Sequence, residues 1–376
     1  MNILVLFGHG NKPGLLRMLK SVEERLVPGG YQFFHVIDLS NDTFADYGFD
    51  EKSCIRIRKV KRSKGFPGGL FQVGDQKSLL SFCIEKGIDL ILSYTLSTLP
   101  TAIALAKKSG APSAVWLHNH YPDASKRYGK YQLNRCDAII AVSDFVMEGA
   151  REYLGETDKK LFVTYNGIDV EKFKLQADEH TVLESLPQFN EGGVVIGMIA
   201  AMDRNKNPQL LLNAVARIKA LKPKKDLRVL LVGRFSDSGY EAETKKLAED
   251  LGLKDETFFL GFQRNVSAIY KVLDIFVYPS YRDACPLAPM ESMAWGKVVV
   301  ASETGGVPEI VEAGVTGILC ESGNEMQFTQ AIQKLVENSD LRNEMGIKGR
   351  ERVQECFSLD RLAKDVDKIF TLVAGN

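Results

Sequence analysis

Short apolar runs of strand character alternate with helical patterns along the whole chain, and this alternation constrains the fold more than any other feature. A first series of runs lies at residues 3–7, 90–92, 115–117, 138–142 and 161–163. A second series lies at residues 194–199, 228–232, 258–260, 275–278 and 298–301. Strands that alternate with helices form parallel sheets wrapped by crossover helices. The two series predict an α/β protein with two Rossmann-like, doubly wound parallel-sheet domains.

A polar stretch without a clear strand interrupts the alternation and indicates a linker. We expect an N-terminal domain at 1–170, a linker at 171–193, a C-terminal domain at 194–357 and a C-terminal helix at 358–376 that packs back toward the N-terminal domain. That last helix is amphipathic through Leu362, Val366, Ile369 and Phe370. A further helix is expected at 208–221, with Pro208 in its first turn. Its predicted buried face carries Leu211, Ala214, Val215, Ile218 and Leu221.

Composition restricts the function classes. The chain has 376 residues, 45% hydrophobic and 26% charged, which is typical of a globular protein of about two domains. Lys plus Arg and Asp plus Glu number 48 each, so no net positive field favours nucleic acid. The six cysteines form no Cys-x-x-Cys pair, and we interpret them as buried thiols. No signal peptide or membrane-spanning run is evident, which favours a cytoplasmic protein.

Two carboxylates stand eight positions apart after the run at 275–278. Asp283 lies in the loop Pro279–Pro286, and Glu291 lies inside the helix that we expect to begin near Leu287. The N–H groups at the start of a helix bind anions such as a diphosphate. In that arrangement Glu291 would accept hydrogen bonds from a ribose diol, and Asp283 from a sugar. The following residues contain a strand, the diglycine Gly305-Gly306 and a short helix, and glycine permits a close approach of the backbone.

This run from Asp283 to Gly317 resembles the C-terminal signature of glycosyltransferase family 4. The signature is an acid, seven residues and Glu, followed in register by Ala-x-Gly and Gly-Gly-x-x-Glu, here with Asp283 as the first acid. Asn166-Gly167-Ile168-Asp169 is similar to the domain junction of the family. The resemblance implies the GT-B fold, in which two Rossmann-like domains face a central cleft.

The resemblance also implies a set of site residues. The expected catalytic residues are His118, Lys206, Asp283 and Glu291. The expected donor-binding residues are Gly14, Arg204, Arg234, Phe262, Pro286, Leu287 and Ala288. Two positions depart from the family pattern, since Ala201 stands where an arginine is usual and Asp283 where a glutamate is usual. Arg204, in the same loop as Ala201, is our hypothesis for the missing positive charge.

The implied activity is transfer of a sugar, with retention of configuration, from a UDP- or GDP-sugar to a hydroxyl acceptor. The acceptor would be a carbohydrate or a lipid-linked molecule in polysaccharide, lipopolysaccharide or glycolipid biosynthesis. Because lysine and helix N–H groups can neutralise the departing diphosphate, no metal or cofactor is expected. A nucleotide-sugar epimerase on the same fold and a non-catalytic nucleotide-sugar-binding protein are the alternatives that stay open.

Two charged segments have a plain and a functional interpretation. In the segment from Arg56 to Lys64, basic residues alternate with Ile57 and Val60 and follow Ile55. This pattern indicates either a strand with one solvated face or a platform for anionic lipid at the inner face of the membrane. These basic residues are Arg56, Arg58, Lys59, Lys61, Arg62 and Lys64. The triplet Asp365-Val366-Asp367 matches a metal-binding pattern of other transferases, but its helical setting favours a solvated helix face.

Overall fold

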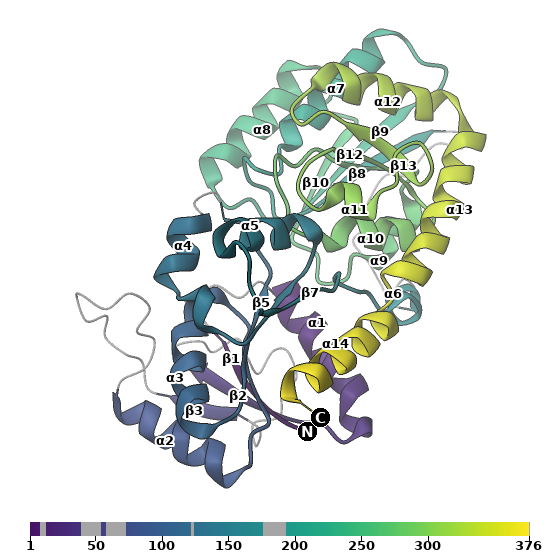
Figure 1. Cartoon of the computed structure of the whole chain (residues 1–376). Helices are drawn as coiled ribbons and strands as arrows, with labels where there is room; N and C mark the ends of the chain where they lie inside the picture. Colours follow the sequence, from purple (N-terminus) through teal and green to yellow (C-terminus); the bar gives the residue numbers. More distant parts are fainter. Residues whose placement is uncertain (8–12, 39–53, 58–72, 122–123, 176–192, 376) are drawn as a thin grey trace. The chain divides into compact units, whose positions relative to one another are not determined.

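The chain folds into two compact units, which Figure 1 draws as one ribbon. The computed structural model describes residues 1–7, 13–38, 54–57, 73–121, 124–175 and 193–375. Unit 1 comprises Met1–Gly167 and Leu359–Asn376, and unit 2 comprises Ile168–Ser358. Unit 2 thus begins within the Asn166–Asp169 motif and ahead of the expected linker. The first residues of that linker belong to helix α6 (Val170–Leu175), and residues 176–192 lie outside the described part of the chain.

Unit 1 is built on a parallel sheet. Among the described residues, its seven strands lie in the order β3–β2–β1–β4–β5–β6–β7. They are β1 (Asn2–Leu6), β2 (Gln32–Asp38), β3 (Cys54–Ile57), β4 (Leu90–Ser93), β5 (Ser113–Leu117), β6 (Ala138–Ala141) and β7 (Lys160–Val163). Every residue of β4, β5 and β6 is buried, as expected where helices cover both faces of a sheet. The strand order reverses between β1 and β4, and ligands of such sheets bind at the carboxyl ends beside that point.

Two helices in the described part of unit 1 show capping residues, one at its start and one at its end. They are α1 (Pro13–Leu26), α2 (Val73–Glu85), α3 (Leu99–Ser109), α4 (Ala124–Lys130), α5 (Asp144–Leu154) and α14 (Leu359–Ala374), with short 3-10 helices at Val27–Gly29, Leu96–Thr98 and Leu133–Arg135. The Ser143 hydroxyl caps α5 by accepting a hydrogen bond from the N–H of Val146. Gly110, with φ of 83°, ends α3 in the left-handed conformation.

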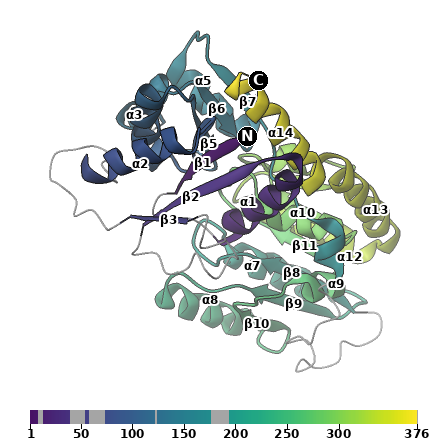
Figure 2. The ribbon, with the colours of Figure 1, turned by 90° about the horizontal axis from the view of Figure 1, so that it is seen from below.

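Helix α14 returns from the end of the chain to unit 1, where it lies beside α1 (Figures 1 and 2). Its predicted apolar face is buried, with Leu362, Val366, Ile369 and Phe370 at most 5% exposed. Polar contacts flank this face. The Arg25 Nε donates to the Asp360 carboxylate at 2.5 Å. The tertiary packing of α14 therefore completes the hydrophobic core of unit 1.

The carboxylates of Asp365 and Asp367 lie on a solvated face of α14, as expected, because the Asp365 side chain is 43% exposed and Asp367 is exposed. The Tyr31 hydroxyl donates to Asp367 Oδ1 at 2.6 Å, and Arg361 donates to Asp365 Oδ2 at 2.8 Å. These solvated carboxylates also accept hydrogen bonds, and the partner of Asp367 comes from a distant part of the sequence. Within the described residues, no group of three or more His, Cys, Asp or Glu side chains is arranged to hold a metal ion.

Unit 2 repeats the same strand order in a six-stranded sheet. Among the described residues, the strands follow one another as β10–β9–β8–β11–β12–β13 and every pair is parallel. They are β8 (Val194–Ile199), β9 (Leu227–Val232), β10 (Thr257–Gly261), β11 (Ile275–Tyr278), β12 (Val298–Ser302) and β13 (Gly317–Cys320). Here the order reverses between β8 and β11. The loops after these two strands are therefore the ones expected to bind a ligand.

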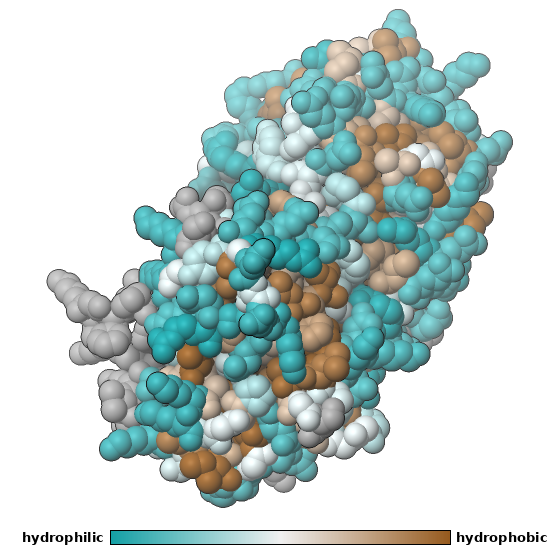
Figure 3. Space-filling view, viewed as in Figure 1, coloured by the Kyte–Doolittle hydropathy of each residue, from teal (hydrophilic) through white to brown (hydrophobic). Residues whose placement is uncertain are grey.

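Helices cover both faces of the second sheet. They are α7 (Pro208–Ala220), α8 (Ser238–Asp250), α9 (Ser267–Val272), α10 (Leu287–Ala294), α11 (Val307–Ile310), α12 (Glu325–Glu337) and α13 (Ser339–Cys356). Ile275 and Val277 share one apolar cluster with α7, α8 and α12. Phe276 points to the opposite face, where its ring contacts Tyr270 of α9. In Figure 3, hydrophilic side chains predominate along α13, which is rich in charged residues.

The structure confirms the predicted fold class and differs from the sequence analysis in local detail. Strands β2 and β13 were not predicted. Leu221 was expected on the buried face of its helix, but α7 ends at Ala220 and Leu221 is 63% exposed. Cys54 and Cys356 are half-buried rather than buried. Among the described residues, every helix is too short or too polar to cross a membrane.

Candidate functional site

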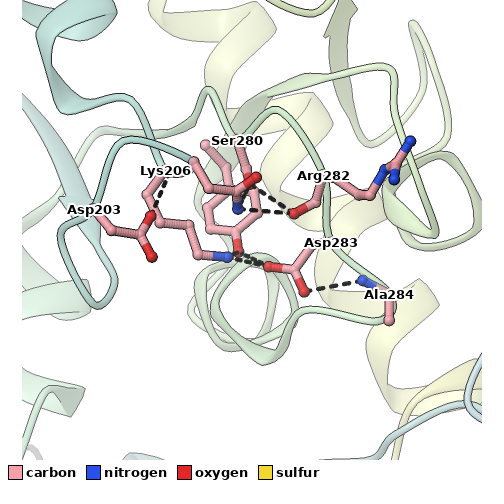
Figure 4. A network of polar contacts seen from close by, with 8 residues as sticks. Asp203, Lys206, Ser280, Arg282, Asp283 and Ala284 are labelled. Carbon is pink, nitrogen blue, oxygen red and sulfur yellow. Dashed lines mark hydrogen bonds and ion pairs between the residues drawn. The ribbon is translucent and has the colours of Figure 1, made fainter. Parts of the chain in front are cut away.

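A lysine, a tyrosine and an aspartate meet where β8 and β11 end (Figure 4). The Lys206 ammonium donates to Asp283 Oδ2 and, at 2.6 Å, to the Tyr278 hydroxyl. The Tyr278 hydroxyl in turn donates to Asp283 Oδ2 at 2.5 Å. The side chains of Lys206 and Asp283 are 14% and 19% exposed, so both partners of this ion pair are partly accessible to solvent. The structure thus brings together two of the four residues expected to be catalytic.

Hydrogen bonds between the two loops hold this network in place. The N–H of Lys206 donates to Asp203 Oδ1 at 2.8 Å, which closes a tight turn just before the lysine side chain. Asn205 Nδ2 donates to the carbonyl of Arg282 at 2.9 Å, and the N–H of Tyr281 donates to the carbonyl of Asn205 at 2.8 Å. The loop after β8 is therefore fixed to the loop after β11.

The diglycine contacts Asp283 directly. The N–H of Gly306 donates to the Asp283 carbonyl at 2.9 Å. Gly305 has a φ of 60°, and a Cβ at this position would lie 2.0 Å from that same carbonyl oxygen. Only glycine fits here, because both the backbone conformation and the space exclude a side chain. In the described structure, Gly305 and Gly306 therefore support the backbone of the aspartate.

Glu291 is the fifth of the eight residues of α10, and a buried tyrosine holds its side chain. The Tyr270 hydroxyl donates to Glu291 Oε2 at 2.9 Å and lies 3.2 Å from the Ala288 carbonyl. Burial and the neighbouring carboxylate raise the pKa of Tyr270 well above its usual value, so its hydroxyl stays protonated. The same is true of Tyr278, with Asp283 as the carboxylate.

The start of α10 offers backbone donors on the same stretch of chain. Pro286 is the N-cap, it supplies no side-chain cap, and Leu287 and Ala288 are the first two helical residues. The first N–H groups of a helix have no intrahelical acceptor and carry a partial positive charge. Leu287 and Ala288 are half-buried, whereas Pro286 is buried. These N–H groups and Lys206 are the candidate anion-binding elements that sequence reasoning selected in unit 2.

The remaining expected residues of unit 2 lie at the same edge but outside this network. The Arg204 guanidinium donates to Glu243 of α8 at 2.9 and 3.1 Å and lies 4.6 Å from the centre of the Tyr240 ring. Its proposed replacement of the arginine missing at Ala201 stays a prediction, and in this structure the side chain is directed to α8. Arg234, after β9, lies 6.0 Å from the ring centre of Phe262, which is 63% exposed after β10.

His118 follows β5 in unit 1 and is 8% exposed. Its ring lies 4.4 Å from that of Tyr94 and 5.4 Å from that of Trp116, measured between centroids. Neither ring nitrogen has a hydrogen-bond partner within the described residues. Burial lowers the pKa of His118 to about 3, so the imidazole is neutral at physiological pH. A buried polar group without partners carries a free-energy cost, and functional sites often contain such groups.

Some of the expected residues lie at the edge of the described part of the chain or outside it. Gly14 lies in the first turn of α1, and the loop before it, residues 8–12, is outside the described residues. Arg56 lies in β3, which agrees with the expected strand there. The other basic residues of that run lie outside the described residues: Arg58, Lys59, Lys61, Arg62 and Lys64.

Sequence reasoning missed Tyr270 and Tyr278, which contact the two carboxylates. Tyr278 ends β11, so its position next to the loop was a usable signal. Tyr270 precedes Glu291 by 21 residues and lies on another helix, and no sequence spacing indicates their contact. A third group was also missed, the buried pair of His35 on β2 and Glu23 on α1, whose Nε2 and Oε1 are 2.7 Å apart.

Comparison with known proteins gives consistent matches over both units. Residues 15–172 match the family described as Glycosyltransferase Family 4, and residues 184–352 match Glycosyl transferases group 1. D-inositol 3-phosphate glycosyltransferase of Corynebacterium jeikeium is 30% identical over 297 residues, which span 72% of this chain and 69% of that protein. The protein of the same name from Corynebacterium kroppenstedtii is 32% identical over 217 residues, 55% of this chain but only 47% of its own length.

Solved structures show the same fold over the full length. The crystal structure of Anabaena HepE in complex with UDP superposes with a TM-score of 0.81, at 18% identity, and covers 99% of this chain and 100% of that one.

Proposed function

This chain belongs to glycosyltransferase family 4, and we propose that it moves a sugar from a UDP- or GDP-sugar to a hydroxyl group with retention of configuration. The single observation that carries this proposal is the position of Lys206. Its ammonium lies at the point where the strand order of unit 2 reverses, held by Tyr278 and Asp283. Sheets of this type bind nucleotides at that point.

In the proposed donor complex, the diphosphate is bound by Lys206 and by the N–H groups of Leu287 and Ala288. Glu291 accepts hydrogen bonds from the ribose hydroxyls, and Asp283 accepts them from the transferred sugar. Arg234 and Phe262 lie after β9 and β10 and are proposed to face the base. The complex of HepE with UDP supports uridine as the first base to test.

The reaction breaks the bond between the anomeric carbon and the diphosphate oxygen and forms one to the acceptor oxygen. Negative charge develops on the departing diphosphate, and Lys206 and the helix N–H groups stabilise it. The proton of the acceptor hydroxyl passes to the departing diphosphate oxygen. We propose that His118, neutral because of its burial, forms a hydrogen bond to the transferred sugar. No metal is required in this scheme.

The acceptor is proposed to be a carbohydrate or a lipid-linked molecule with a free hydroxyl, in polysaccharide, lipopolysaccharide or glycolipid biosynthesis. The basic run from Arg56 to Lys64 supports a peripheral contact with anionic lipid, because each basic residue near such a surface contributes about 1 kcal/mol. Binding to vesicles that does not depend on their anionic lipid content would contradict that contact.

The donor is tested with a thermal-shift panel of UDP-, GDP-, ADP- and dTDP-sugars. A ligand at 100 times its dissociation constant stabilises the folded protein by about 2.7 kcal/mol, which shifts the melting temperature measurably. We expect UDP- or GDP-sugars to produce the shift and Glu291→Ala to abolish it. Product analysis with donor alone separates a transferase, which slowly hydrolyses the donor, from an epimerase, which converts the sugar. A shift preserved in Glu291→Ala would refute the assigned site.

A further inference from the structure

Each carboxylate of the Asp283 and Glu291 pair accepts a hydrogen bond from its own buried tyrosine. Tyr278 donates to Asp283 at 2.5 Å, and Tyr270 donates to Glu291 at 2.9 Å. Tyr270 is fully buried and Tyr278 is 2% exposed, whereas Asp283 and Glu291 are half-buried. The hydroxyls therefore approach the carboxylates from the protein interior, and the carboxylates remain partly open to solvent.

The two tyrosines belong to one row of packed rings. Phe276 lies between them, with its ring centre 5.6 Å from that of Tyr270 and 6.1 Å from that of Tyr278. Tyr270 also contacts Phe173, whose ring centre lies 5.8 Å from its own. Buried aromatic side chains have few accessible rotamers, because close packing leaves no room to move. The row fixes the two hydroxyls in position.

We propose that Tyr270 and Tyr278 are positioning residues for sugar transfer, which orient Glu291 and Asp283 respectively for the bound donor. This inference rests on the proposed function, because it assigns Glu291 to the ribose and Asp283 to the sugar. A carboxylate that must accept hydrogen bonds from a ligand needs a fixed direction, and a neutral donor behind it supplies that direction without neutralising its charge.

Tyr278 has a second partner, and this gives it a distinct role. Its hydroxyl accepts from the Lys206 ammonium at 2.6 Å while it donates to Asp283. When a donor diphosphate takes up Lys206, Asp283 loses its cation and keeps the hydroxyl of Tyr278. The tyrosine then holds the carboxylate in the direction of the sugar. The Tyr270 hydroxyl instead acts on Glu291 and on the Ala288 carbonyl of the first turn of α10.

The test removes each hydroxyl and keeps the ring. Tyr270→Phe is expected to weaken UDP or GDP binding by roughly 10-fold, the size expected for a hydrogen bond to a charged group. Tyr278→Phe is expected to lower turnover of the nucleotide sugar, measured as hydrolysis by water, by roughly 10-fold with a smaller change in nucleotide affinity. Tyr128→Phe is the matched control, because its buried hydroxyl has no hydrogen-bond partner within the described residues.

Double variants separate positioning from a structural role. If Tyr270 acts through Glu291, Tyr270→Phe causes no further loss of nucleotide affinity in a Glu291→Ala background. Because that background binds weakly, UDP or GDP is titrated into the millimolar range. Likewise, Tyr278→Phe causes no further loss of turnover in an Asp283→Ala background. A loss that persists in the alanine backgrounds, or phenylalanine variants with wild-type affinity and turnover, would overturn the inference.

The proposed function and this inference fail in different ways. If Glu291→Ala and Asp283→Ala themselves keep wild-type nucleotide binding and hydrolysis, the proposed site is wrong. If these two variants are impaired and both phenylalanine variants are not, only the tyrosine inference is wrong. Should a phenylalanine variant not fold, 3-fluorotyrosine at position 278 retains ring and hydroxyl. Its fluorine resonance should then shift on addition of UDP or GDP, and an unshifted resonance would count against the exchange of partners at Tyr278.

Discussion

The Lys206 ammonium is ion-paired with the Asp283 carboxylate, although 77 residues separate them in the sequence. The cation proposed to bind the donor diphosphate thus already has an anionic partner. Asp283 and a diphosphate compete for the same ammonium, because both are anions that require its donors. This competition predicts that removal of the Asp283 charge strengthens nucleotide binding and lowers turnover.

Asp283→Asn is expected to bind UDP or GDP more tightly, by roughly 3- to 10-fold, because a partly exposed ion pair of about 1 kcal/mol no longer opposes the diphosphate. Turnover of the nucleotide sugar should fall, since the carboxylate proposed to hold the sugar is lost. Isothermal titration at low salt measures the first effect. Glu256→Gln is the control, because it breaks the ion pair with Lys219 and the Glu256 side chain is 18% exposed, close to the 19% of Asp283. An unchanged or weaker nucleotide affinity in Asp283→Asn would contradict the competition.

Gly305→Ala is expected to lower turnover much more than Gly314→Ala. Both glycines have positive φ, 60° and 75°, so the backbone strain of about 1 kcal/mol is similar. At Gly305 the new Cβ meets the Asp283 carbonyl at 2.0 Å, whereas at Gly314 nothing lies within 4 Å. The comparison of hydrolysis rates and melting temperatures isolates the displacement of Asp283. Equal turnover in the two variants would show that the diglycine does not position this residue.

His118→Leu should stabilise unit 1 while it lowers turnover. Removal of a buried imidazole without hydrogen-bond partners in the described structure relieves a desolvation cost of about 1 kcal/mol. The loss of a group proposed to contact the sugar should reduce the rate, by roughly 100-fold if it acts in the transition state. Because burial holds the pKa of His118 at about 3, its carbon-bound proton resonance should not titrate between pH 5 and 8. A midpoint near 6.5 would contradict the burial described here.

The buried pair of His35 and Glu23 predicts a pH dependence of stability. Burial by itself lowers the pKa of His35, but its hydrogen bonds to Cys54 and Glu23 outweigh that effect and raise the pKa to about 9. His35 therefore binds a proton more tightly in the folded state. Its contribution is fully present below about pH 6.5 and is lost as the pH rises through 9. The free energy of unfolding of unit 1 should fall by about 2 kcal/mol between pH 7 and 9.5.

The two tryptophans allow this measurement, because Trp116 lies in unit 1 and Trp295 in unit 2. In a Trp295→Phe background, the fluorescence of Trp116 follows the unfolding of unit 1. His35→Gln should reduce the decrease in the free energy of unfolding between pH 7 and 9.5. Ionisation of the buried cysteines lowers this free energy further at higher pH. If the free energy of unfolding has the same pH dependence with and without His35, the pair of His35 and Glu23 is not the cause of that dependence.

The order of apolar runs was sufficient to predict the fold class. The elements that it missed or misplaced, strands β2 and β13 and the residue Leu221, have physical causes. The runs at 3–7 and 275–278 correspond to β1 and β11, because strands buried on both faces are apolar throughout. Strand β2 contains His35 and Asp38, so its polar residues concealed it. Strand β13 is four residues long and begins with Gly317, which is atypical of strands. Leu221 is apolar but exposed, because α7 ends at Ala220 and Leu221 does not continue the buried face of the helix.

Sequence by itself determined the two α/β units, the loops after β8 and β11, and the choice of Lys206, Asp283 and Glu291 as candidates. Local periodicity and motif spacing carry that information, because they depend on residues near one another in the chain. Only the tertiary structure decided which side chains face these candidates: Lys206 neutralises Asp283, Tyr278 lies between them, and Tyr270 holds Glu291. The physical reason is that the parallel strands and the helices that cover them bring distant segments to one edge, and the packing that sets each side-chain direction has no counterpart in the order of residues.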